Sequence, residues 1–218
     1  MSTRCEPTAF AGLHVLVDDD PRWSRDPREQ AAAACRGGAP VVQLRTKHAS
    51  DARAAEWGKA IRALTREAGA RFVVNDRFDL ALLAEADAVH LGQDDLPPSA
   101  LPSAARARLA IGRSTHTRQQ ALAAIDEQVD YIAFGPLFET ASKASPYAAR
   151  GLAALREIVA LAGARPVVAI GGIAADNASQ VAAAGARGIA VISAVIGADD
   201  PAAATREMVA SFDAGGSV

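Results

Sequence analysis

Acidic side chains follow two neighbouring candidate strands, and their type suits the binding of a metal ion and a diphosphate. Asp76 comes shortly after an apolar run at Phe72–Val74, and Asp95 follows a second run at Ala88–Leu91. Carboxylates at the carboxyl ends of neighbouring parallel strands can hold Mg²⁺, which usually keeps water and phosphate oxygens as its other ligands. The sequence therefore predicts a magnesium site formed by Asp76 and Asp95.

Each carboxylate also has a simpler interpretation when it is taken alone. Asp76 precedes a predicted helix that begins near Phe78, and Asp95 precedes Leu-Pro-Pro, so either residue could cap a helix. For each residue singly, capping is the favoured interpretation. Because the two occur in adjacent loops beside Arg45 and Lys47, the combination favours the magnesium site.

Three polar side chains alternate at the end of another candidate strand. Gln43, Arg45 and Lys47 are separated by Leu44 and Thr46, so a strand directs the three polar residues to one side. We expect these three donors to converge on an anion. The alternative, a solvated strand end with a stray salt bridge, has about equal weight from this pentapeptide alone.

A polar turn at 112–117 is predicted after the fifth strand, and it carries Ser114 and His116. No Gly-x-Ser-x-Gly nucleophile elbow is present, so Ser114 is interpreted as a hydrogen-bonding or positioning group. His116 and His90 are candidate acid/base groups, but a structural role is the favoured interpretation of both.

Later strands end in segments suited to anions. The long loop 135–147 carries Thr140, Ser142 and Lys143, which we expect to close over an anion, although a mobile solvent loop is an equal alternative from length alone. Small residues at Gly171-Gly172 and around Ser193 allow backbone N–H groups to approach a phosphate.

These residues need a scaffold that brings strand ends together, and the hydrophobic pattern supplies one. Short apolar runs alternate with Ala-rich stretches of helical spacing, including Asp51–Ala68, Arg118–Asp126, Leu152–Ala162 and Asn177–Ala184. Eight such units in a little over 200 residues predict a (β/α)8 TIM barrel. The predicted strands are His14–Val17, Val41–Leu44, Phe72–Val74, Ala88–Leu91, Leu109–Gly112, Tyr131–Phe134, Val167–Ile170 and Gly188–Ile192.

Composition narrows the class of protein. The 218 residues are 50% hydrophobic, which suits a single domain over 1–218 with a core at about 12–212. A formal net charge of -2 argues against nucleic acid and anionic membranes as partners, and no apolar run approaches the length of a membrane span. We expect a cytoplasmic protein that acts on small molecules and forms a homodimer.

With these motifs in view, the sequence resembles the thiamine-phosphate synthase family, which also includes thiazole tautomerases. The resemblance covers nearly the whole chain, and its motifs arrive in the family's order. They are Val42–Lys47, Val74–Leu80, Val89–Asp95, Ile111–Thr117, Phe134–Lys143 and Val168–Ile173.

The resemblance implies a transferase that couples a hydroxymethylpyrimidine diphosphate to a thiazole phosphate and releases diphosphate. It implies Mg²⁺ at Asp76 and Asp95, and catalytic roles for Lys47, Ser114 and Lys143. It also implies which residues bind the substrates. Those for the pyrimidine diphosphate are Gln43, Arg45, Lys47, Asn75, Ser114 and Lys143. Those for the thiazole phosphate are Thr140, Ser142, Gly172 and Ser193, and Ile192 is a further substrate contact.

The sequence departs from the family pattern in places. Thr46 and Glu139 stand where many members carry Glu and Pro, and Ser142 replaces Thr. The segment 18–27 after the first strand has no assigned role; it either shapes the mouth of the barrel or is a surface loop.

Two other functions are weighed against the synthase. A thiazole tautomerase shares the barrel and the thiazole-phosphate site but needs no diphosphate clamp, and His116 would be its proton shuttle. A catalytically silent phosphate-binding barrel would be expected to lose a metal carboxylate or a diphosphate lysine. Retention of Asp76, Asp95, Lys47 and Lys143 favours the synthase.

We expect Lys143→Ala to slow coupling of the two substrates, because the lysine would stabilise charge on the departing diphosphate. Steady-state turnover of the purified variant measures this. If 135–147 is only a solvent loop, the variant will match the parent.

Overall fold

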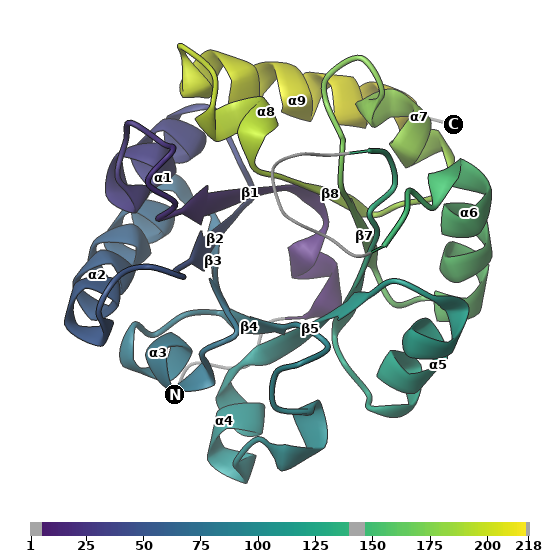
Figure 1. The fold of residues 1–218 in the computed structure, drawn as a ribbon, viewed down its shortest axis with the longest axis horizontal. Helices are drawn as coiled ribbons and strands as arrows, with labels where there is room; N and C mark the ends of the chain where they lie inside the picture. Colours follow the sequence, from purple (N-terminus) through teal and green to yellow (C-terminus); the bar gives the residue numbers. More distant parts are fainter. Residues whose placement is uncertain (1–5, 140–146, 217–218) are drawn as a thin grey trace.

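The computed structural model describes residues 6–139 and 147–216, and the eight strands among them form a closed parallel barrel (Figure 1). Neighbours in the chain pair in order, and β8 pairs with β1 to close the ring. The strands are β1 (Gly12–Asp18), β2 (Val41–Arg45), β3 (Arg71–Asn75), β4 (Ala88–Leu91), β5 (Ala110–Thr115), β6 (Tyr131–Phe134), β7 (Val167–Ile170) and β8 (Gly188–Val191).

Helices surround this ring on its outer side (Figure 1). The α-helices are α1 (Pro27–Arg36), α2 (Asp51–Ala68), α3 (Phe78–Leu83), α4 (Ser103–Arg108), α5 (Arg118–Asp126), α6 (Gly151–Ala162), α7 (Ala178–Ala183), α8 (Ser193–Ile196) and α9 (Pro201–Gly215). Two 3₁₀ turns are η1 (Pro7–Phe10) and η2 (Pro98–Ala100). In the described part of the chain, no helix has both the length and the apolar character that a membrane span requires.

Local sequence explains where the first long helices begin and end. Asp26 caps α1 by accepting from the N–H groups of Arg28 and Glu29, and Glu29 accepts in return from the Asp26 N–H, which completes a capping box. Ser50 caps α2, and Gly69 ends it at a φ of 70° that favours glycine. These signals place α1 and α2 directly after the loops that carry the site.

The predicted barrel is confirmed, and all eight predicted strands overlap an observed one. The strand boundaries differ by at most two residues except at β5, where the predicted turn at 112–117 begins inside the strand, which continues to Thr115. Arg113, Ser114 and Thr115 pair with Ile132, Ala133 and Phe134 of β6. Polar residues can continue the strand here because each has a partner or a polar surrounding: Arg113 and Thr115 donate to the Gly92 and Ala133 carbonyl oxygens, and Ser114 faces the barrel interior.

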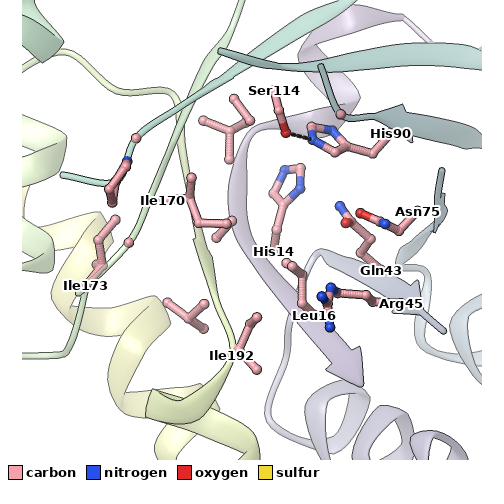
Figure 2. A pocket seen from close by; sticks show the side chains of 18 of the residues that line it. His14, Leu16, Gln43, Arg45, Asn75, His90, Ser114, Ile170, Ile173 and Ile192 are labelled. Atoms are coloured by element: carbon pink, nitrogen blue, oxygen red, sulfur yellow. Dashed lines mark hydrogen bonds between the residues drawn. The ribbon is translucent and has the colours of Figure 1, made fainter. Parts of the chain in front are cut away.

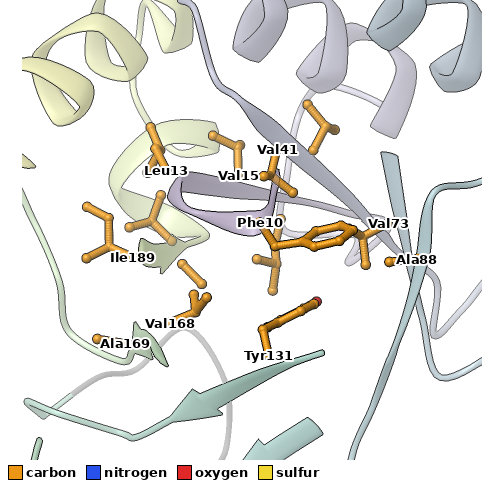
Figure 3. Packing of buried hydrophobic residues seen from close by; sticks show 14 of the residues in the cluster. Phe10, Leu13, Val15, Val41, Val73, Ala88, Tyr131, Val168, Ala169 and Ile189 are labelled. Carbon is orange, nitrogen blue, oxygen red and sulfur yellow. The ribbon is translucent and has the colours of Figure 1, made fainter. Parts of the chain in front are cut away.

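The lower interior of the barrel is filled by aromatic and branched side chains (Figure 3). Phe10, at the end of η1, is fully buried, and its ring stacks on Tyr131 with 5.3 Å between centroids. Val73 and Val168 are also buried in this cluster. The packed layer makes the barrel a core with a pocket above it and not an open channel.

We expect Phe10→Ala to lower the free energy of unfolding by about 3 to 5 kcal/mol, because it removes a fully buried ring and leaves a cavity. Urea denaturation of parent and variant measures the change. Leu83→Ala is the control: Leu83 is 59% exposed, and its loss should change stability by about 0.5 kcal/mol or less. A loss at Phe10 as small as that at Leu83 would show that the Phe10 ring does not contribute to the packed layer.

Candidate active site

A cavity of about 490 Å³ opens at the carboxyl ends of the strands. Side chains from every strand or from the loop after it line the cavity. Its lining includes ten of the residues predicted from the sequence to bind substrate or metal. They are Gln43, Arg45, Lys47, Asn75, Asp76, Asp95, Ser114, Gly172, Ile192 and Ser193.

The two sides of the cavity differ in chemical character (Figure 2). Gln43, Arg45 and Asn75 project from one side, while Ile170 and other isoleucines project from the opposite side. The alternation predicted for β2 explains the polar side, because Gln43, Arg45 and Lys47 line the cavity and Leu44 is buried outside it. The cavity can therefore receive a charged group on one side and an apolar ring on the other.

Lys47, Asp76 and Asp95 form a charged cluster on the polar side. Lys47 Nζ donates to Asp76 Oδ2 at 2.5 Å, and the Asp76 and Asp95 carboxyl groups hydrogen-bond to each other. The side chains of Lys47 and Asp76 are 45% and 19% exposed, so solvent and ligands reach the cluster. Three loops, after β2, β3 and β4, supply one member each.

Neither carboxylate caps an α-helix, so the capping interpretation was wrong. Arg77 is the N-cap residue of α3, and Asp76 stands one residue earlier at a φ of 64°. This left-handed conformation costs free energy in a non-glycine residue, although Asp tolerates it better than most. Asp95 instead accepts from the Gly92 N–H at 2.6 Å and so closes its own loop.

Opposite pKa shifts distinguish the two carboxyl groups. Burial by itself raises the pKa of Asp76, but its hydrogen bonds with Asp95 and Lys47 outweigh burial and lower the pKa below its ordinary value. Burial, followed by the hydrogen bond with Asp76, raises the pKa of Asp95. When the pair holds one proton, that proton therefore resides on Asp95.

Arg45 has a buried partner that the sequence analysis missed. Its Nη1 donates to Asp18 Oδ2 at 2.5 Å, and the Asp18 side chain is only 3% exposed. Asp18 ends β1 and pairs in register with Arg45. The signal available in the sequence was an acidic residue at the start of the unassigned segment 18–27, directly after the predicted first strand.

Gln43 presents an acceptor to the cavity. Its side-chain oxygen is buried and, within the described residues, has no hydrogen-bond donor. An unmatched buried acceptor is costly, so a ligand that brings an N–H group would be favoured here. Asn75 projects beside Gln43 from the end of β3 (Figure 2).

Ser114 lies on β5 and takes part in a hydrogen-bonded chain. His90 Nε2 is 2.9 Å from Ser114 Oγ, and His90 Nδ1 is 3.1 Å from the Tyr131 hydroxyl (Figure 2). Gly112 permits this contact, because a Cβ there would lie 2.1 Å from the Tyr131 ring. His90 thus orients the Ser114 hydroxyl.

His116 lines the cavity mouth beside Tyr147, which the sequence analysis did not assign. The two rings stack with 4.0 Å between centroids, and His116 Nδ1 is 2.6 Å from the Gly135 carbonyl oxygen. A carbonyl oxygen only accepts, so Nδ1 carries the hydrogen. This contact ties β5 to the beginning of the loop after β6.

Gly171 and Gly172 follow β7 at φ values of 98° and 65°. A Cβ at Gly171 would lie 2.5 Å from Pro136 Cβ, and one at Gly172 would lie 2.5 Å from the Glu139 carbonyl oxygen. Glycine is therefore required for the close approach of the loop after β6. Ser193 opens α8 on the same side of the cavity.

Some predicted residues lie outside the described residues. They are Thr140, Ser142 and Lys143, which were predicted to bind an anion from the loop after β6.

Together the fold and the site define a (β/α)8-barrel protein with a charged pocket at the carboxyl ends of its strands. A family model described as thiamine monophosphate synthase matches residues 13–195. The chain therefore belongs to the thiamine monophosphate synthase family, as its motifs predicted.

Individual proteins agree with this assignment. The curated thiamine-phosphate synthase of Anaeromyxobacter dehalogenans (strain 2CP-C) is 49% identical over 209 residues, covering 94% of this chain and 90% of that protein. That of Chloroflexus aurantiacus is 45% identical, covering 90% of each. A solved structure described as thiamine phosphate pyrophosphorylase from Pyrococcus furiosus has a TM-score of 0.83 and 39% identity, covering 95% of this chain and 97% of that one.

His14, a buried residue of β1 that lines the pocket, predicts how stability depends on pH. Its Nε2 donates to the Phe10 carbonyl oxygen at 2.7 Å, and burial lowers its pKa from 6.5 to about 4, with the hydrogen bond partly opposing this. Between pH 6.5 and about 4, the imidazole is protonated in the unfolded chain but neutral in the folded chain. The contribution of His14 to the free energy of unfolding is therefore fully present above pH 6.5 and is lost as the pH drops toward 4.

We expect the parent to lose about 2 to 3 kcal/mol more than His14→Asn over this window, at about 1.4 kcal/mol per unit of pKa shift. Urea denaturation at several pH values measures the difference. His48→Asn, at an exposed histidine, is the matched control for the substitution itself. Parallel profiles for the parent and His14→Asn would contradict a buried neutral imidazole.

Proposed function

We propose that the protein is a thiamine-phosphate synthase, which joins 4-amino-2-methyl-5-hydroxymethylpyrimidine diphosphate to a thiazole phosphate. The observation that carries the proposal is the meeting of Lys47, Asp76 and Asp95 in one charged cluster of the pocket. Membership of the thiamine monophosphate synthase family supports the same activity.

The reaction breaks a carbon–oxygen bond, and negative charge develops on the diphosphate as it departs. Lys47 and Arg45 line the side of the pocket where that charge would form. Positive groups that are already in position stabilise developing charge at little cost in reorganisation. We assign both residues to the diphosphate, together with Lys143 from the loop outside the described residues.

Asp76 and Asp95 suit magnesium by their chemistry. Both offer hard carboxylate oxygens, and their mutual hydrogen bond brings two negative groups together, which a cation would relieve. In residues 6–139 and 147–216, no group of three or more His, Cys, Asp or Glu side chains is arranged for a metal. When bound, Mg²⁺ would neutralise charge on the diphosphate oxygens.

The pyrimidine would lie against the polar strands β2 to β5. The buried Gln43 oxygen suits the exocyclic amino group of an aminopyrimidine, because it is an acceptor that lacks a donor in the described residues. Asn75 and Ser114 would complete the contacts, with Ser114 oriented by His90. The amino group donates electrons to the ring, which supports the carbocation formed when diphosphate leaves.

The thiazole would occupy the apolar side. Ile170, Ile173 and Ile192 supply a surface for its ring, and Gly172 and Ser193 would hold its phosphate with Thr140 and Ser142. The ring nitrogen then bonds to the cationic carbon with its lone pair, so no protein nucleophile and no proton transfer is needed. The protein contributes proximity and fixed charge.

A cytoplasmic location and a homodimer complete the proposal. Both stem from the composition and exposed surface of the barrel, as argued from the sequence.

The decisive experiment supplies purified protein with both substrates, with and without magnesium, and measures diphosphate and thiamine phosphate. Equal amounts of both products that depend on magnesium would support the synthase. Isomerisation of a thiazole phosphate alone, without diphosphate release, would contradict it and favour the tautomerase.

We expect Asp76→Asn and Asp95→Asn each to lower turnover by about 100-fold or more, because each removes a charge that would hold magnesium. Steady-state rates over a range of magnesium concentrations measure this, and thermal unfolding checks the fold. Asp79→Asn is the matched control, since Asp79 is exposed and pairs with Arg77 outside the pocket. Rates near the parent's in both site variants would remove the metal assignment.

A further inference from the structure

The segment between β1 and α1, to which the sequence assigns no role, is hydrogen-bonded through one side chain to the loop that carries Lys47. The Asp19 carboxylate accepts three backbone N–H groups, from Lys47 at 2.7 Å, His48 at 3.0 Å and Ala49 at 2.7 Å. These residues connect the end of β2 to Ser50, the N-cap of α2. One side chain thus holds three consecutive backbone N–H groups of the turn after β2.

That turn determines where the Lys47 ammonium group lies. Lys47 has a long side chain that is 45% exposed, and its Nζ reaches Asp76 on a different loop. A lysine has several rotatable bonds, so a mobile backbone beneath it would add to the freedom of its charged end. Anchoring the backbone N–H of Lys47 itself removes part of that freedom.

Asp19 is held in turn by its own segment. Asp18 Oδ1 accepts from the Asp20 N–H at 2.8 Å, directly beside Asp19. Further along, Arg25 donates to the carbonyl oxygens of Ala198 and Asp199 at 3.2 and 2.7 Å, beyond α8. The segment is therefore hydrogen-bonded near both of its ends, which a carboxylate needs if it is to position another loop.

Removing Asp19 has two possible effects on the affinity for diphosphate, one through its charge and one through its hydrogen bonds, and they have opposite signs. A negative charge near a diphosphate site opposes anion binding, so removing it would strengthen diphosphate binding if charge alone mattered. Loss of the three hydrogen bonds would instead loosen the Lys47 turn and weaken diphosphate binding. The direction of change thus identifies the role.

We propose that Asp19 is a positioning residue that acts through Lys47: it holds the turn 47–49 so that the Lys47 ammonium group meets the diphosphate. This inference rests on the proposed synthase function for its catalytic consequence. Binding of inorganic diphosphate tests it without any turnover.

The test compares Asp19→Ala and Asp19→Asn in the parent and in a Lys47→Ala background. In the parent, Asp19→Ala should weaken inorganic diphosphate binding about tenfold and lower kcat/KM about 10- to 100-fold, because the lysine loses its place. Asp19→Asn keeps the size of the side chain but turns an N–H₂ group toward one set of donors, so a smaller loss is expected. In the Lys47→Ala background both effects should fall below about twofold.

Two further measurements separate positioning from general stability. Hydrogen exchange should become faster at residues 47–49 in both Asp19 variants, while thermal unfolding should shift equally with and without Lys47. Asp20→Asn is the matched control from the same segment; Asp20 pairs with exposed Arg22, and the change should leave diphosphate binding at the parent's level.

The outcomes are distinct. Tighter diphosphate binding by Asp19→Ala, or an equal loss in both backgrounds, would overturn the proposal. If Asp19→Ala does not fold, Asp19→Asn carries the same comparison. A parent that binds diphosphate but forms no thiamine phosphate would contradict the proposed function, and the diphosphate cycle would still decide the role of Asp19.

Discussion

Pairing of β1 with β8 closes the barrel, and the site depends on that closure. Parallel strands in a closed ring place all their carboxyl ends on one face, so residues distant in the chain share one cavity. Asp18 and Ser193 lie near opposite ends of the sequence, yet the segment after Asp18 hydrogen-bonds to the chain beyond α8. An open sheet would separate these two edges and divide the pocket.

Closure also forces like charges together, and the protein balances them by pairing. Asp18 forms an ion pair with Arg45, and Asp76 hydrogen-bonds to both Lys47 and Asp95. A buried charge without a partner would be strongly unfavourable, so each carboxylate and cation fixes the other's position. The same pairing orients Arg45 and Lys47 toward the cavity, which links the stability of the strand ends to their proposed chemistry.

Part of the site could be predicted because the relevant signals are local. The alternation of Gln43, Arg45 and Lys47 follows from strand geometry, and the structure places all three in the cavity. Asp76 and Asp95 were brought together by the order of the βα units alone. Ser114 was predicted to be a site residue, and it lines the cavity, but it was placed in a turn and lies on β5. A run of polar residues resembles a loop unless the interior that it faces is known to be polar.

The sequence by itself determined the barrel, the strand order and the edge at which the polar residues gather, since hydrophobic periodicity and motif order are carried by neighbouring residues. Only the tertiary structure decided the partners: Asp18 with Arg45, Asp19 with the turn 47–49, and His90 with Ser114. It also decided that Asp76 and Asp95 contact each other and do not cap helices. The physical reason is that hydrogen bonds and ion pairs form between atoms a few ångströms apart in space, and their distances are set by closure and packing.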